Sequence, residues 1–236
     1  METVSQTEDS GSRIQRIWLV RHGATLWNSE QRFCGHSDIP LSPSGSDQAR
    51  WLASYLRSSS IGIIYTSDLS RARQTAEIIA HSQSQTIPIL PSFAWRELDF
   101  GAWEGLTYAQ IAECFPQQLA FFTDPFHTSP PDGETFSSLV QRVWDAFLTL
   151  LRDDGRGGVN PRPVGSDIVL VSHGGPLRAL LCCILKMPLD RQWQLRLDPG
   201  SLSALEFLPT TDAAVPDITL TLLNVQRPDC PDYHTA

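Results

Sequence analysis

The chain has 236 residues, of which 41% are hydrophobic, and its formal net charge at pH 7 is -8. This length allows one sizeable hydrophobic core and disfavours a division into two very small domains. The acidic balance excludes non-specific binding to nucleic acid or to an anionic membrane surface, because both require a cationic footprint. A bound anion must therefore be held locally. Lys186 is the only lysine, and arginine suits bidentate recognition of phosphate or carboxylate.

Cysteine usage and the N-terminal sequence indicate the compartment. The five cysteines are odd in number and lack CxxC spacing, which is typical of reduced thiols in a cytosol. The N-terminus has no apolar segment typical of a signal peptide, and no stretch is long enough to span a bilayer. We expect a soluble, cytoplasmic protein that associates with neither nucleic acid nor membrane.

The first strand of the chain ends in reactive side chains. Residues Met1–Gln15 are polar and are expected to form a flexible tail. The apolar run Ile17–Val20 then predicts a strand buried on both faces, and Arg21, His22 and Gly23 follow it directly. In open α/β sheets ligands bind beyond the carboxyl ends of the strands. Arg21 and His22 are therefore predicted at a binding site.

The next segments alternate between helix and strand. Ser42 and Pro43 predict the start of a helix, and a second strand is expected at Ile61–Tyr65. A helix over 67–80 and a third strand at Ile87–Leu90 complete a βαβαβ pattern. This pattern predicts an α/β fold, a three-layer sandwich in which helices flank a mostly parallel central sheet.

The middle of the chain differs in composition. From Phe93 to about Pro163 the sequence is rich in aromatics and broken by prolines, which indicates an inserted helical lid. Its last helix is expected to be capped by Glu134 or Thr135 and to run to about Arg152, with a Gly/Pro-rich loop after it. We expect a single domain over 16–226 that contains this lid, and a C-terminal tail over 227–236.

A second predicted strand is also followed directly by a histidine and glycine. The run Asp167–Ser172 predicts a strand, His173 follows it, and Pro176 is expected to start the next helix. The final strands are expected at 203–208 and 218–225.

Four basic side chains are predicted just past strand ends and can share one pocket. They are Arg21, His22, Arg73 and His173. Arg71 and Arg73 both fall in the first turns of the helix over 67–80. Such a pocket fits a phosphoryl group, with added N–H groups from the Pro176 helix, and one histidine can act as the nucleophile. The residues themselves do not decide between His22 and His173.

Five motifs in order identify a family resemblance. They are RHGAT at 21–25 with Asn28 and Arg32 downstream, SDLSRARQTA at 67–76, RELDFGAWEG at 96–105, PDGETF at 131–136 and SHGG at 172–175. Together they resemble the histidine phosphatase superfamily, in its phosphoglycerate mutase-like branch, nearest to small bacterial phosphatases such as α-ribazole phosphatase. The resemblance covers most of the chain between the two tails.

The resemblance implies a role for each matching residue. His22 is implied as the phosphorylated nucleophile, and Glu97 as the proton donor and acceptor. The residues implied to hold the substrate are Arg21, Asn28, Arg32, Arg73, His173 and Gly174. No cofactor is expected, and no metal, because metal-site motifs are absent and the pocket already supplies positive charge. Cys34 departs from the longer polar side chain common in related sequences, and is interpreted as a passive residue of the pocket rim.

Three functions are compatible with this pattern. From Leu98 to Gln141 there is no Lys or Arg, and such an acidic lid disfavours the second strong anion that a mutase substrate carries. We therefore expect a phosphatase that acts on a small phosphorylated metabolite. The part of the substrate other than the phosphate is expected to be neutral or zwitterionic and to face the lid aromatics. The alternative for these aromatics is that they form the lid's own core. A bisphosphate-primed mutase, with Arg32 binding the second anion, and a non-catalytic phosphate-binding module are the alternatives. An apolar edge strand or lid face could support a homodimer.

Overall fold

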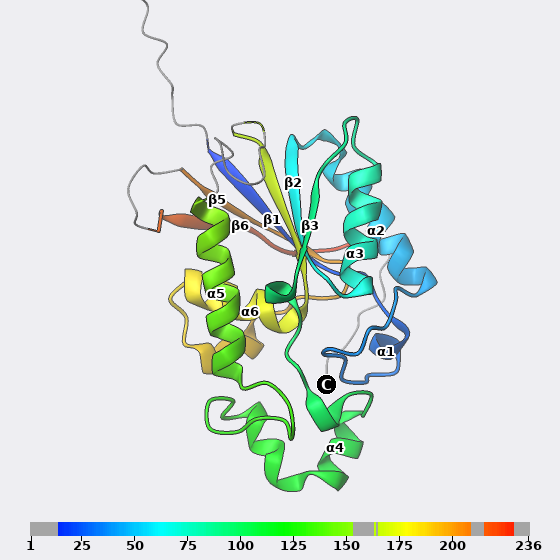
Figure 1. Ribbon diagram of the computed structural model, residues 1–236, viewed down its shortest axis with the longest axis vertical. Coiled ribbons are helices and arrows are strands. Elements are labelled where there is room, and N and C mark those ends of the chain that lie inside the picture. The colour runs from blue at the N-terminus through cyan, green and yellow to red at the C-terminus, as the bar shows by residue number, and fades with distance from the viewer. Residues whose placement is uncertain (1–13, 153–162, 164, 209–214, 229–236) are drawn as a thin grey trace, which may run out of the picture.

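A six-stranded sheet forms the centre of the molecule (Figure 1). The computed structural model describes residues 14–152, 163, 165–208 and 215–228. The sheet order is β3-β2-β4-β1-β5-β6, with strands β1 (Gln15–Arg21), β2 (Ile61–Ser67), β3 (Ile89–Ser92), β4 (Asp167–Ser172), β5 (Leu202–Phe207) and β6 (Ile218–Val225). Strands β3, β2, β4 and β1 pair in parallel, whereas β5 runs antiparallel to both β1 and β6. The expected mostly parallel sheet is confirmed.

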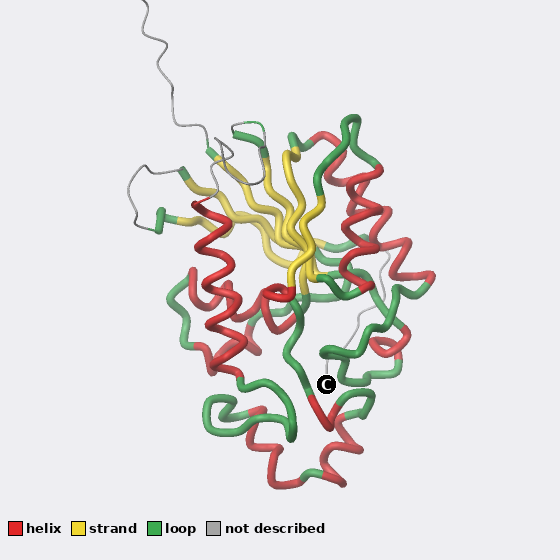
Figure 2. The backbone as a smooth tube through the Cα atoms, in the orientation of Figure 1, coloured by secondary structure: helices red, strands yellow, loops and turns green. Residues whose placement is uncertain are grey.

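Helices cover both faces of the sheet (Figures 1 and 2). One face carries α2 (Pro43–Tyr55) and α3 (Ser70–His81), and the other carries α5 (Phe136–Arg152) and α6 (Gly174–Ile184). The remaining helical segments are α1 (Leu26–Ser29), α4 (Tyr108–Cys114) and the 3-10 turns η1 (Leu56–Ser58), η2 (Phe93–Trp95), η3 (Gly101–Trp103), η4 (Pro116–Phe122) and η5 (Leu189–Gln194). The three-layer α/β architecture is therefore as expected.

Strand β1 explains why both faces need a cover. Successive side chains of a strand point to opposite faces. Ile17 and Leu19 join the hydrophobic core beneath α5 and α6, whereas Trp18 and Val20 join the core beneath α2 and α3. Because all four side chains are at most 5% exposed, the apolar run buries both faces of this central strand.

Several element boundaries differ from the sequence expectations by one to three residues. β1 starts at Gln15, which pairs with Phe207, and α3 starts at Ser70 because β2 continues in the sheet to Ser67. Helix α6 starts two residues before Pro176, since a proline is tolerated anywhere in the first turn. The expected tails, beyond Ile14 at one end and Pro228 at the other, and the loop at 153–165 apart from Pro163 and Gly165, lie outside the described residues.

The segment between β3 and β4 contains a cluster of aromatic side chains that is continuous with the core beneath α5 and α6. Trp103 is fully buried, stacks on Phe122 with ring centroids 5.6 Å apart, and meets Phe121 and Phe33 edge to face. These aromatic side chains of the lid are therefore used for packing within the protein. Thr135 caps α5, because its hydroxyl accepts a hydrogen bond from the Ser138 amide. In the described part of the chain, no helix has the length and apolar character needed to cross a membrane.

Candidate functional site

Two histidines face each other at the carboxyl edge of the sheet. β1 and β4 are parallel neighbours, and their register pairs Arg21 with Ser172. The residues that follow, His22 and His173, therefore lie side by side, with ring centroids 4.9 Å apart at an interplanar angle of 63°. Both side chains are buried. The structure thus brings together the two histidines at the strand ends, as the sequence predicts.

Hydrogen bonds assign a different tautomer to each ring. His22 Nδ1 lies 2.7 Å from the carbonyl oxygen of Gly23, which can only accept, so Nδ1 carries the proton and Nε2 keeps its lone pair. His173 Nδ1 lies 3.2 Å from Arg71 Nε, which can only donate, so Nδ1 accepts and the proton is on Nε2. One ring presents a nucleophilic nitrogen and the other presents an N–H donor.

The described residues leave two buried donors at this site without a hydrogen-bond partner. Arg21 Nη1 donates to the carbonyl oxygen of Leu197 at 2.6 Å. Arg21 Nε and His173 Nε2 are buried and have no hydrogen-bond partner among the described residues. Because a buried donor without a partner costs free energy, such groups in native proteins call for an explanation, and a ligand supplies one.

The guanidinium that reaches the histidines belongs to Arg71. Arg71 is fully buried and donates to His173 Nδ1, to Ser37 O at 2.8 Å and to Gly35 O at 2.6 Å. The prediction that the Arg73 side chain lies in the pocket is wrong, because Arg71 takes that place. Residues two apart on a helix do not share a face, so the Arg73 side chain is 54% exposed and lies 3.6 Å from Glu77.

Glu97 is held at the first turn of α6. Its carboxylate accepts hydrogen bonds from the Leu98 amide at 2.9 Å and from the Gly175 amide, which is 3.1 Å from each oxygen. This contact requires glycine, since a Cβ atom at residue 175 would lie 2.3 Å from Glu97 Oε1. Of the N–H groups at the start of α6, which were expected to add to the phosphoryl pocket, that of Gly175 therefore holds the Glu97 carboxylate.

Charge and burial set the protonation of the site. Burial, followed by the positive charges of Arg71 and Arg21, holds the pKa of His22 well below its usual range. Burial and Arg71 do the same to the pKa of His173. Burial, together with the neighbouring Arg178, lowers the pKa of Arg21 to about 10. At neutral pH both histidines are therefore uncharged, while Arg21 keeps its charge.

Arg178 is a further cation that the sequence reasoning missed. It lies on α6 at 9% exposure, its Nε donates to Leu195 O at 3.0 Å, and its guanidinium lies 5.2 Å from the Trp193 ring centroid. A Cβ atom at Gly174 would lie 3.4 Å from Arg178 Nη1 and 3.5 Å from Arg21 Cζ, so both guanidinium groups flank this glycine. A lone arginine within the apolar run from Pro176 to Leu181 was the available signal.

The other expected substrate-binding residues are engaged in the loop after β1. Asn28 Oδ1 accepts from the Thr25 amide at 2.9 Å in the capping box of α1. Arg32 Nη1 donates to Gly105 O at 2.6 Å, and Arg32 Nε lies 2.5 Å from Glu30. Both contacts hold the loop structure. Among the described residues, none of the His, Cys, Asp and Glu side chains form a group of three suited to a metal ion.

Cys34 lies at the rim formed by this loop. Burial raises the pKa of its thiol to about 11, so the group is protonated at neutral pH. A protonated, largely buried thiol is a poor nucleophile. This agrees with the interpretation of Cys34 as a passive residue.

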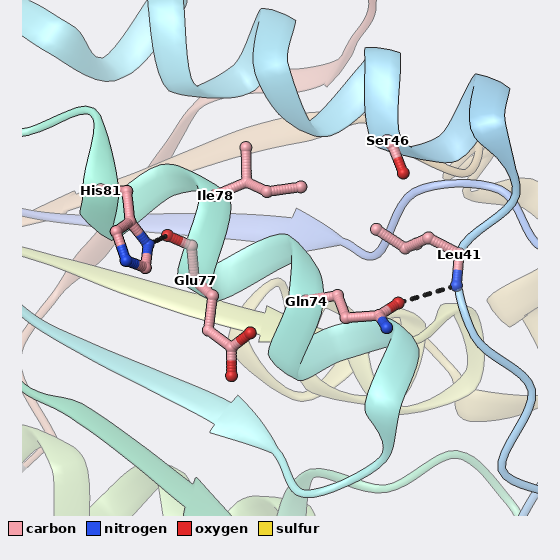
Figure 3. Close-up of a pocket in the computed structure, with 6 residues that line it drawn as sticks. All are labelled: Leu41, Ser46, Gln74, Glu77, Ile78 and His81. Atoms are coloured by element: carbon pink, nitrogen blue, oxygen red, sulfur yellow. Dashed lines mark hydrogen bonds between the residues drawn. The ribbon is translucent and has the colours of Figure 1, made fainter.

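A hollow between α2 and α3 lies apart from the histidines (Figure 3). Two of the side chains drawn there are engaged in hydrogen bonds, with Gln74 accepting from the Leu41 amide at 2.9 Å and His81 Nδ1 lying 2.6 Å from Glu77 O. The residues that line it are Leu41, Ser46, Gln74, Glu77, Ile78 and His81. The hollow does not bring cationic and nucleophilic groups together as the strand-end site does.

Comparison with known proteins assigns the site to a family. Residues 17–215 match the family model of the histidine phosphatase superfamily (branch 1), and the chain belongs to this superfamily. It is similar to the adenosylcobalamin/α-ribazole phosphatase of Escherichia coli strain K12, with 31% identity over 81% of this chain and 89% of that protein. It is equally similar to the 2,3-bisphosphoglycerate-dependent phosphoglycerate mutase of Cytophaga hutchinsonii, with 31% identity over 82% and 88% of the two chains.

A solved structure supports the same fold. The native mycobacterial glucosyl-3-phosphoglycerate phosphatase matches with a TM-score of 0.77 and 28% identity, covering 91% of this chain and all of that chain. Proteins similar to this chain thus include phosphatases and a mutase.

Proposed function

We propose that this protein is a phosphatase that hydrolyses a small-metabolite phosphomonoester through a phosphohistidine at His22, with no requirement for a metal. One observation carries the proposal. The neutral His22 ring, with its lone pair on Nε2, lies with its centroid 4.9 Å from that of His173, and His173 Nε2 and Arg21 Nε are buried donors without a partner among the described residues. A nucleophile next to donors that suit phosphoryl oxygens is the arrangement that phosphoryl transfer requires.

The first step forms a bond between His22 Nε2 and phosphorus while the ester P–O bond breaks. Arg21, Arg71 and the His173 Nε2–H group stabilise the negative charge on the phosphoryl oxygens. Glu97, in its protonated form, donates its proton to the leaving oxygen, so the alcohol departs uncharged. The Gly23 carbonyl oxygen, bonded to His22 Nδ1, orients the ring and favours the positive charge that the imidazole gains.

The second step returns the enzyme to its first state. Water attacks phosphorus, Glu97 accepts the proton that water loses, and the P–N bond breaks to release inorganic phosphate. His22 regains its lone pair. Glu97 can donate a proton in the first step and accept one in the second because the amides of Leu98 and Gly175 hold its carboxylate in place.

The contacts of the loop favour hydrolysis over the mutase reaction. A mutase must bind a second strong anion on its substrate, and Arg32 was the candidate for that contact. Its guanidinium is already bonded to Gly105 O and paired with Glu30. The segment from Leu98 to Gln141 supplies no Lys or Arg in its place. We therefore propose a substrate whose leaving group is neutral or zwitterionic.

The test is release of inorganic phosphate from p-nitrophenyl phosphate in excess EDTA, for the wild type and for His22→Ala. Metal-independent turnover is expected in the wild type and absent in the variant, which should retain a cooperative thermal transition. Acid quench during turnover should trap an acid-labile phosphoryl group on the wild type alone. A panel of metabolite monophosphates then defines the substrate.

Other results would reassign the function. A phosphorylated product formed at the rate of substrate loss, and only with a bisphosphate primer, would establish the mutase. Tight phosphate binding without turnover would establish a binding module.

A further inference from the structure

The loop over 34–37 lies between two opposite charges. On one side, the Glu104 carboxylate accepts three hydrogen bonds from successive amides of the loop, from Gly35 at 3.1 Å, His36 at 2.7 Å and Ser37 at 3.2 Å. Successive backbone N–H groups that converge in this way form a binding site for an anion. Here a side chain of the same chain fills that site.

On the other side, the carbonyl oxygens of the same loop face Arg71. Arg71 Nη2 donates to Gly35 O at 2.6 Å, with a longer contact of 3.4 Å to Cys34 O, and Nη1 donates to Ser37 O at 2.8 Å. The loop thus presents amides to an anion and carbonyl groups to a cation. Each charge stabilises the loop conformation that binds the other.

The close approach of the loop to Glu104 depends on Gly35. A Cβ atom at residue 35 would lie 2.4 Å from Glu104 Oε1 and 2.1 Å from Leu98 O. No larger residue fits without movement of the loop or of the Leu98 backbone. The packing therefore leaves the loop little room to adopt another position while Glu104 is bound.

Arg71 connects this arrangement to the reacting groups. Its third nitrogen, Nε, donates to His173 Nδ1 and thereby places the His173 proton on Nε2. We propose that Glu104 is a positioning residue for phosphoryl transfer, holding the loop over 34–37 so that Arg71 stays aligned with His173. The proposal rests on the proposed function for its effect on rate. Glu104 acts through the loop and has no role in the bond changes themselves.

The test compares Glu104→Gln with Glu113→Gln. Glutamine has nearly the shape of glutamate but offers one acceptor oxygen, and its NH2 group would face loop amides. Glu113 lies exposed on α4 of the same lid, so its variant removes the same charge without touching the loop. A shift of about 1 Å in catalytic geometry can lower a rate by about 100-fold. We expect a fall in kcat of that order for Glu104→Gln and wild-type kcat for Glu113→Gln.

A second measurement separates positioning from a general loss of structure. The ¹⁵N NMR signals of the His173 ring should show a single Nε2–H tautomer in the wild type and a mixture of tautomers in Glu104→Gln. If a folded Glu104→Gln keeps either the wild-type kcat or the single tautomer, the proposal is overturned. Should this variant fail to fold, Glu104→Asp takes its place, because it keeps the charge but is too short to reach all three amides.

The two readouts also separate this proposal from the proposed function. If the wild type releases no phosphate from any monophosphate, the proposed function fails. The tautomer comparison then still decides whether Glu104 positions His173 through Arg71.

Discussion

Replacing Arg71 and Arg73 in turn by lysine distinguishes two cations that are two residues apart on one helix. Arg71→Lys keeps the positive charge but loses the planar group that bonds Ser37 O, Gly35 O and His173 Nδ1 together. Each hydrogen bond to a charged group contributes about 1.5–3 kcal/mol. Because lysine retains some of them, we expect a net loss of about 3 kcal/mol, which lowers Tm by about 6–12 °C in a domain of this size.

The effect of Arg71→Lys on activity follows from the same contacts. The variant loses the bond that fixes the His173 tautomer and the contacts that hold the loop over 34–37 beside it, so kcat should fall by about 100-fold. Arg73→Lys changes an exposed side chain, and its stability should stay within about 0.5 kcal/mol of the wild type with unchanged kcat. Calorimetry and phosphate release measure both effects. If Arg73→Lys is the inactive variant, or if both variants behave alike, the assignment of Arg71 to the site is refuted.

Three further predictions concern Glu97, its contact glycine and the buried histidines. Glu97→Gln should slow the hydrolysis of alkyl phosphates far more than that of p-nitrophenyl phosphate, and equal losses on both would contradict its role as an acid. Gly175→Ala should displace the Glu97 carboxylate and lower kcat by about 100-fold, and a wild-type rate for this variant would contradict the contact. Because the pKa values of His22 and His173 are lowered in the folded state, the unfolded chain binds protons below about pH 6.5 that the folded protein does not. The free energy of unfolding should therefore fall from pH 6.5 to 5 by up to about 1.4 kcal/mol per pH unit for each histidine, and denaturant titrations that show no such slope would contradict the burial of neutral rings.

Strands and caps could be predicted from the sequence because local patterns determine them. The run Asp167–Ser172 forms a strand with the expected bounds, and the Ser42 side chain caps α2 through the Gly45 amide at 3.0 Å. Histidines that follow two buried strands were predicted to meet at one edge, and parallel pairing of β1 with β4 places them there. These features require only the periodicity of a strand and the chemistry of a cap.

To predict which of Arg71 and Arg73 enters the site, one must know which face of α3 packs against the sheet. Arg71 shares a buried row of the helix with Thr75 and Ile79, at intervals of four residues, whereas Arg73 lies off that row. The hydrophobic pattern contained this signal. The contacts of Glu97 with Gly175, 78 residues apart, and of Glu104 with the loop over 34–37 depend on how the lid packs against the sheet. Neither contact could be predicted from local sequence patterns, because each joins residues that are far apart in the chain.

The position of β4 determines when the reactive pair can exist during folding. β4 pairs with both β1 and β2, which have no ladder between them, and it follows the lid in the chain. During synthesis β1, α2, β2 and α3 are therefore made before the strand that joins them. Closing so long a connection is slow, because its entropy is lost before the ladder forms. His22 can therefore meet His173 only after β4 has been made and has paired with β1.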